Sequence, residues 1–175
     1  MRIGVGAPMR YLFIDRVLDI DAHGGGTITI RKAFPRSEEY FDGTFRRQDE
    51  VPASLLLETM ATAGSSLLTA RSRYQAHALL LKVNRATFRR PARAGDAVVV
   101  RARLAGLQGD WARPDAAADA RPLAEVHTRA FVGEDPVAES ALLFVGLPFA
   151  WTLGSRREEP LAGMLELLGY TDRRP

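Results

Sequence analysis

The sequence predicts an α+β domain in which an antiparallel sheet of five to six strands wraps around one long central helix. Two observations lead to this prediction. One long segment, residues 52–73, is apolar around most of a helix, and shorter segments on both sides of it alternate apolar and polar residues between turn signals. An antiparallel sheet has to bury one face, and this helix is the one element large enough to cover it. A chain of 175 residues with 46% apolar residues suffices for one such core.

The segments before the helix predict a hairpin. Residues 11–20 are apolar with interspersed charges, and residues 27–34 alternate with a period of two. Gly24, Gly25 and Gly26 supply the turn between them. Ser37 begins a predicted single helical turn over residues 37–41.

The helix has a marked start and one polar stripe. Pro52 suits the first helical position, where its missing N–H costs nothing, and Asp49 and Glu50 complement the positive end of the helix dipole. Because apolar side chains cover most of the circumference, we expect the helix to be buried nearly all round. The polar exceptions recur at spacings of three and four and share one stripe: Ser54, Glu58, Thr62, Ser65 and Thr69.

Four strands are expected after the helix. Their ranges are 79–88, 95–104, 123–132 and 137–147, with a turn at 133–136 and an exposed loop at 108–121. Residues 156–170 predict a short helix with an apolar face. We therefore expect a single domain over residues 1–150 and a C-terminal tail with a short helix over residues 151–175.

Composition excludes several classes of function. Without cysteine, the chain has no disulfide, thiolate nucleophile or cysteine-ligated metal, and its three histidines lie far apart in the sequence. A net charge of +3 does not argue for nucleic-acid binding, although a local group of arginines could receive an acidic partner or a phosphate. No secretory signal and no apolar run of about 20 residues is present, so we expect a cytoplasmic protein without a membrane span.

Three stretches resemble the β-hydroxyacyl-acyl-carrier-protein dehydratase family of the hotdog fold. They are Tyr-Leu-Phe-Ile-Asp-Arg-Val-Leu-Asp-Ile at 11–20, Tyr-Phe-Asp-Gly-Thr-Phe at 40–45 followed by the helix start at 51–64, and Lys-Val-Asn-Arg-Ala-Thr-Phe-Arg-Arg-Pro-Ala-Arg-Ala-Gly-Asp at 82–96. The likeness covers about residues 10–147. It implies the hotdog fold and a homodimer or higher oligomer, because that family builds each site from two chains.

The resemblance also implies site residues for a 3-hydroxyacyl thioester. The family's helix glutamate, which handles the departing C3 hydroxyl, falls on Glu58, and its helix-start amide, which polarises the thioester carbonyl, falls on Ala53. The family's loop histidine, the base for the C2 proton, is replaced by Thr44, and its helix glutamine by Thr62. We expect these residues to be catalytic: Glu58, Thr44 and Thr62. We expect these to bind substrate: Gly43, Phe45, Ala53 and Phe88. We expect these to meet a carrier: Arg89, Arg90 and Arg93.

Each assignment has a structural alternative. Glu58 interrupts an apolar run, where burying a carboxylate is costly, but it could also lie exposed or at an interface on the polar stripe. Thr44 could be a plain loop residue, and Gly43 could supply a positive φ in the same loop. Thr62 could be a small residue that lets another helix or strand approach, and Phe88 could end a strand at a bulge.

Three functions remain open at this stage. The first is a dehydratase-like protein of fatty acid or polyketide-type biosynthesis, acting on an acyl carrier protein or coenzyme A thioester. The second is a thioesterase, because hotdog thioesterases that use a helix glutamate and a threonine one turn later are similar to Glu58 and Thr62. The third is a non-catalytic thioester-binding subunit that pairs with an active paralogue. None of the three implies a metal or a redox cofactor.

Overall fold

The computed structural model describes residues 13–41, 49–114 and 121–148. Within these ranges the chain forms one long helix, a short 3-10 helix and six strands. In chain order they are β1 (Arg16–Asp21), β2 (Thr27–Ala33), η1 (Glu39–Phe41), α1 (Ala53–Arg71), β3 (Ala76–Phe88), β4 (Ala97–Gln108), β5 (Leu123–Val132) and β6 (Asp135–Pro148). The predicted α+β class, with one central helix and five to six strands, is confirmed.

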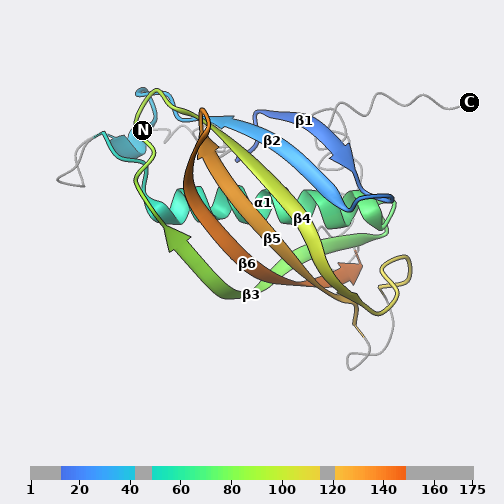
Figure 1. The fold of residues 1–175 in the computed structure, drawn as a ribbon. Helices are drawn as coiled ribbons and strands as arrows, with labels where there is room; N and C mark the ends of the chain where they lie inside the picture. The colour runs from blue at the N-terminus through green and yellow to red at the C-terminus, as the bar shows by residue number, and fades with distance from the viewer. Residues whose placement is uncertain (1–12, 42–48, 115–120, 149–175) are drawn as a thin grey trace, which may run out of the picture.

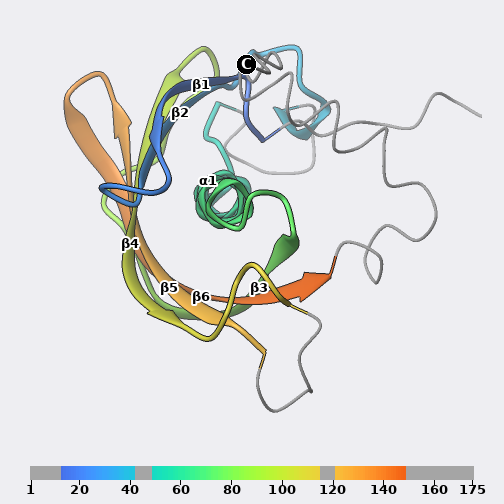
Figure 2. The same ribbon diagram turned by 90° about the vertical axis from the view of Figure 1, so that its right-hand side faces the viewer.

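The six strands form one sheet in the order β1-β2-β4-β5-β6-β3, and every neighbouring pair is antiparallel. The sheet curls around α1, which runs through its concave side (Figure 1). The view along the helix axis shows the strands wrapped around α1 as an open half-cylinder (Figure 2). The strands β1 and β3 are the two free edges of this sheet.

Alternation along each strand decides which side chains form the core. Ile28 and Ile30 of β2 are buried against the helix, while Arg31 between the inward positions is exposed. The same alternation places Val98 and Val100 of β4 inside. These rows pack against fully buried residues of α1 and the central strands: Met60, Leu67, Leu68, Val126, Leu142 and Phe144.

The helix α1 is buried in its C-terminal half and open in its first two turns. Thr69, at the end of the polar stripe, is 1% exposed, whereas Ser54 and Glu58 at its beginning are exposed. The expectation that the helix is buried nearly all round is therefore wrong for its first turns. The physical reason is that the sheet covers the helix from one side and ends at the edge strand β3, so the described residues leave the helix face beyond that edge uncovered.

The edge strand β3 carries an exposed apolar segment. Its register against β6 shifts between Leu80 and Lys82 and again between Val83 and Arg85, so Leu81 has no partner in the ladder and is 57% exposed. The register does not shift at Phe88, where the strand ends. The exposed large apolar residues of β3 are Leu80, Leu81, Val83 and Phe88.

The predicted hairpin at the start of the chain is confirmed, with an additional feature. The carboxylate of Asp21 accepts hydrogen bonds from the main-chain N–H of Gly24 at 2.7 Å and of Gly25 at 2.5 Å. Hydrogen bonds from Gly25 and Gly24 stabilise the charged form, which lowers the pKa of Asp21 below its usual value of 3.8. Gly26 has a φ of 61°, the left-handed conformation that glycine adopts without strain.

Several predicted boundaries move. The strand expected from residue 79 begins at Ala76, and the turn expected at 133–136 is shorter, because β6 begins at Asp135. The helical turn expected over 37–41 is present as η1. The predicted tail over 151–175 lies outside the described residues, so the domain division stays a prediction.

Candidate active site

A cavity of about 610 Å³ lies where α1 begins and β3 ends. Its size is in the usual range for a small-molecule site, and most of its wall is apolar. Among the described residues, two segments that are far apart in the sequence make the wall, one leading into α1 and one following β3. The lining residues are Glu50, Val51, Pro52, Ala53 and Leu56 from the first, and Phe88, Arg89, Arg90, Pro91 and Ala92 from the second.

Main-chain hydrogen bonds hold the two segments together. The N–H of Val51 donates to the carbonyl of Ala92 at 2.8 Å, and the N–H of Ala94 donates to the carbonyl of Asp49 at 2.8 Å. Between these bonds, Glu50 and Arg93 form an isolated antiparallel bridge. The segment before the helix is thereby fixed on the segment after β3, which gives the cavity two rigid walls.

The first residue of α1, Ala53, lines this cavity. Pro52 is the N-cap residue and not the first residue of the helix, so α1 begins one residue later than expected. The carbonyl of Pro52 accepts a hydrogen bond from the N–H of Leu55 at 3.0 Å. Within the described residues no side chain caps this end. The N–H groups of Ala53 and Ser54 therefore have no partner inside the helix, and they carry the partial positive charge of its N-terminus. Such amides can hold a carbonyl oxygen that gains negative charge.

Two of the predicted substrate-binding residues, Ala53 and Phe88, meet in this cavity. They come from α1 and from the end of β3, so only the folded chain brings them together. Three other predicted site residues, Gly43, Thr44 and Phe45, lie outside the described residues.

The three predicted carrier-binding arginines are all ion-paired. Arg89 lies 3.2 Å from Glu139, Arg90 lies 3.1 Å from Asp135, and Arg93 lies 2.6 Å from Asp49. The three guanidinium groups are about half exposed, so each pair contributes little to stability and can exchange partners at low cost.

Glu58 and Thr62 do not line the cavity within a single chain. Glu58 is exposed, and the hydroxyl of Thr62 donates to the main-chain carbonyl of Glu58 at 2.8 Å rather than to its carboxylate. One turn further, the hydroxyl of Ser65 donates to the carbonyl of Ala78 at 2.6 Å. The polar stripe therefore runs along the side of α1 that faces β3, and Glu58 lies where that side is open.

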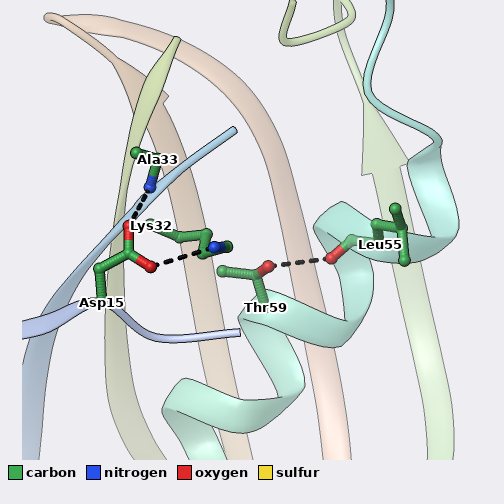
Figure 3. Close-up of polar contacts among 5 residues, drawn as sticks. All are labelled: Asp15, Lys32, Ala33, Leu55 and Thr59. Atoms are coloured by element: carbon green, nitrogen blue, oxygen red, sulfur yellow. Dashed lines mark hydrogen bonds and ion pairs between the residues drawn. The ribbon is translucent and has the colours of Figure 1, made fainter. Parts of the chain in front are cut away.

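Sequence reasoning missed two charged groups. Glu50 lines the cavity, whereas its position in the sequence indicates only a role at the helix dipole, because no local pattern marks the pairing of its segment with the one that follows β3. Lys32 occupies an inward position of β2, is 9% exposed, and lies 3.0 Å from Asp15, which also accepts from the N–H of Ala33 at 2.6 Å (Figure 3). A lysine at an inward position of an alternating strand was the signal for this second group.

The described residues contain neither a candidate metal site nor a candidate membrane-spanning helix. Within ranges 13–41, 49–114 and 121–148, no three histidine, aspartate or glutamate side chains gather in a way that could hold a metal ion. In the same part of the chain, no helix combines the length and the apolar character that crossing a bilayer requires.

The chain matches the family model described as a FabA-like domain over residues 6–128, and it belongs to that family. It is 32% identical to the 3-hydroxyacyl-[acyl-carrier-protein] dehydratase FabZ of Moorella thermoacetica over 140 residues, which cover 78% of this chain and 88% of the relative. It is 41% identical to the FabZ of Protochlamydia amoebophila over 91 residues, which cover 51% of this chain and 58% of that relative. The family resemblance predicted from the sequence is confirmed.

Solved structures give the same fold. A hot-dog-like protein from Thermanaerovibrio acidaminovorans superposes with a TM-score of 0.57 at 15% identity, covering 73% of this chain and 85% of that one. A phenylacetic acid degradation-related protein from Ralstonia eutropha, described as a candidate thioesterase, superposes with a TM-score of 0.56 at 19% identity, covering 74% and 82%. The architecture is therefore the hotdog fold.

Proposed function

We propose that this protein binds a 3-hydroxyacyl thioester in the cavity at the start of α1 and dehydrates it, in fatty acid or polyketide-type biosynthesis in the cytoplasm. The observation that carries the proposal is the mostly apolar cavity of about 610 Å³, which is lined by Ala53, the first residue of α1, at a helix end without a side-chain cap. Membership of the FabA-like family adds the substrate class, because the curated relatives are dehydratases of this kind.

The cavity supports the chemistry of such a substrate. The apolar side chains of Val51, Leu56 and Phe88 suit an acyl chain, and the helix amides suit a thioester carbonyl whose oxygen becomes negative when a proton leaves C2. Gly43 and Phe45 are further proposed to bind this substrate, and Thr44 to take part in the reaction.

We propose that the active form is a homodimer joined at the free edge of β3. A strand of thirteen residues with an unpaired edge and exposed Leu80, Leu81 and Val83 is suited to pairing with a second copy. The second copy would cover the open side of α1 along the polar stripe, which would bring Glu58 into an interface. This supports a role for Glu58 in handling the departing hydroxyl.

An acyl carrier protein or coenzyme A is the proposed carrier. Arg89 and Arg90 line the cavity, and their ion pairs are exposed enough to be replaced by a phosphate or a carboxylate of the carrier. Arg93 lies on the same connection and adds a third exposed guanidinium group.

A second candidate is an acyl thioesterase. The observation that favours it is the position of Glu58 and Thr62 one turn apart on the open side of α1. The third candidate, a non-catalytic binding subunit that partners an active paralogue, needs the cavity alone.

One assay separates the three candidates. Purified protein is incubated with 3-hydroxyacyl thioesters of increasing chain length, and loss of water and release of free thiol are measured in parallel. Water loss supports the dehydratase, and thiol release without water loss supports the thioesterase. Binding of the thioester with neither product supports the binding subunit, and absence of binding contradicts all three.

A gain-of-function variant tests the role of the loop. If dehydration is limited by a missing base, Thr44→His raises its rate at least about tenfold, because a neutral imidazole is a competent base near neutral pH. Thr29→His, on the outer side of β2, is the control and leaves the rate unchanged. Absence of a gain means that the loop has diverged or that another group supplies the base.

A further inference from the structure

Among the described residues that line the cavity, Glu50 is the one carboxylate. The remaining lining groups are apolar apart from Arg89 and Arg90, which are paired with Glu139 and Asp135 of β6. Glu50 is partly buried and precedes Ala53, whose amide opens α1, by three residues. A glutamate and the first residue of α1 thus line one mostly apolar cavity. Removal of a proton next to a carbonyl requires a base and a hydrogen-bond donor to the carbonyl oxygen, and these two residues carry such groups.

We propose that Glu50 is the catalytic base of this site. The proposal rests on the proposed function, since it assigns the proton transfer that dehydration of a 3-hydroxyacyl thioester needs. It also accounts for how a chain with Thr44 at the family's histidine position could retain the reaction.

The reaction balances with Glu50 as its one proton carrier. The carboxylate takes the proton from C2 of the thioester, and the electron pair of that C–H bond becomes the C2–C3 double bond. The C3–O bond breaks, and the leaving hydroxide takes the same proton from the Glu50 carboxyl to form water. The products are the enoyl thioester and water, Glu50 returns to its carboxylate form, and no oxidant, reductant or further reactant is consumed.

The backbone of Glu50 is held more firmly than that of an ordinary loop residue. It forms the bridge with Arg93, and the residues on either side of it are hydrogen-bonded to the opposite segment, Val51 to Ala92 and Asp49 to Ala94. A base must be held close to its productive position, and a glutamate whose main chain is anchored on the opposite segment meets that requirement better than one on an unsupported turn.

Glu58 is less suited to this step within one chain. Its side chain is exposed, does not line the cavity, and lies on the side of α1 that faces the edge strand β3. The two carboxylates can therefore have different roles. Glu50, at the helix start, takes the proton from C2, and Glu58 acts on the C3 hydroxyl from the proposed interface. A reaction that needs only the base for the C2 proton distinguishes the role of Glu50 from that of Glu58.

Hydrogen exchange at C2 of a saturated acyl pantetheine thioester is such a reaction, because this probe has no hydroxyl to lose. The protein and the probe are mixed in D2O, and deuterium at C2 is followed by NMR, while binding of the same probe is measured by calorimetry. Wild-type protein is expected to catalyse the exchange. Glu50→Gln is expected to slow it at least about 100-fold, in the range for loss of a general base, while the Kd for the probe changes less than about threefold. Glu125→Gln, the same change on the outer side of β5, leaves both values unchanged.

The outcomes separate this proposal from the proposed function. Absence of probe binding by the wild-type protein overturns both. Binding and exchange that persist in Glu50→Gln, or that are lost in Glu58→Gln instead, overturn the role of Glu50 and leave the proposed function standing. Binding without any exchange also overturns it. If Glu50→Gln does not fold, Glu50→Asp withdraws the carboxylate by one methylene and is expected to slow exchange at least about tenfold with unaltered binding, and an unaltered rate refutes the proposal.

Discussion

The close contact between α1 and the sheet at Gly64 makes a quantitative prediction about stability. A Cβ added at Gly64 would lie 2.9 Å from Cζ and 3.0 Å from Cε2 of Phe144, and 3.4 Å from Cγ1 of Val126. Both neighbours are fully buried, so neither can move aside without displacing other core residues. This glycine therefore sets how deeply α1 sits in the concave face of the sheet.

Two opposing effects decide the result of Gly64→Ala. Alanine is favoured over glycine inside a helix by about 1 kcal/mol, whereas overpacking a well-packed core costs about 1–3 kcal/mol. Because the nearest atoms belong to a rigid buried ring, we expect the second effect to be larger and the free energy of unfolding to fall by about 1 kcal/mol. For a chain of this size, that corresponds to a melting temperature lower by about 2–4 °C.

Urea unfolding followed by circular dichroism measures this difference. Gly106→Ala is the matched control, because a Cβ there would lie 3.8 Å from Glu125, an ordinary contact, and we expect no loss. Phe144→Leu removes both ring atoms, so the double variant with Gly64→Ala should be more stable than the sum of the single losses, with a coupling of at least about 0.5 kcal/mol. A Gly64→Ala protein as stable as the wild type would refute the reasoning.

Three further predictions concern the edge strand, the half-buried His77 and the partly buried ion pair between Lys32 and Asp15. Leu81→Lys should raise the dissociation constant of the proposed dimer at least about tenfold, as measured by sedimentation, because it places a charge in an apolar interface. Leu18→Lys, on the opposite edge strand β1, is the control and should leave this constant unchanged. Equal dimerisation of the two variants would contradict the β3 interface. Burial lowers the pKa of His77 in the folded protein below its usual value of 6.5. As the pH falls below 6.5, the unfolded chain therefore takes up a proton at His77 before the folded protein does. The contribution of His77 to stability is complete above pH 6.5 and is lost as the pH falls below that value. Unfolding between about pH 8 and pH 5 should show this loss, and His77→Gln should reduce it. Asp15→Ala should lower the free energy of unfolding by about 2–3 kcal/mol, because it leaves the Lys32 ammonium, 11% exposed, without its carboxylate. Lys32→Met should lower it by about 1 kcal/mol or less, because the Asp15 carboxylate is 33% exposed and still accepts a main-chain N–H. A larger loss for Lys32→Met than for Asp15→Ala in urea unfolding would contradict this account.

The elements of the fold could be predicted because their signals are local. Alternation with a period of two marks the inward residues of β2 and β4, and a long apolar segment introduced by Pro52 marks α1, so each element follows from residues that are neighbours in the chain. The order of the strands was not accessible in this way. It depends on which strand pairs with β6, and β3 pairs there across a long stretch of sequence.

The candidate site could be predicted in part. The resemblance placed Ala53 and Phe88 in a substrate site, and both line the cavity. It could not place Glu50, since that residue faces the cavity only because its segment pairs with the connection that follows β3. The apolar run around Glu58 suggested a buried carboxylate, but burial of a helix face depends on what packs beside it.

The sequence by itself determined the type and approximate extent of each element, the family, and the chemical kinds of residue at the start of α1. Only the tertiary structure decided which of those residues share a cavity, which arginines are paired with carboxylates of β6, and which face of α1 stays open beside β3. The physical reason is that periodicity and capping act over a few neighbouring residues, whereas a cavity, an ion pair and a free edge are made by segments that meet after the chain has folded.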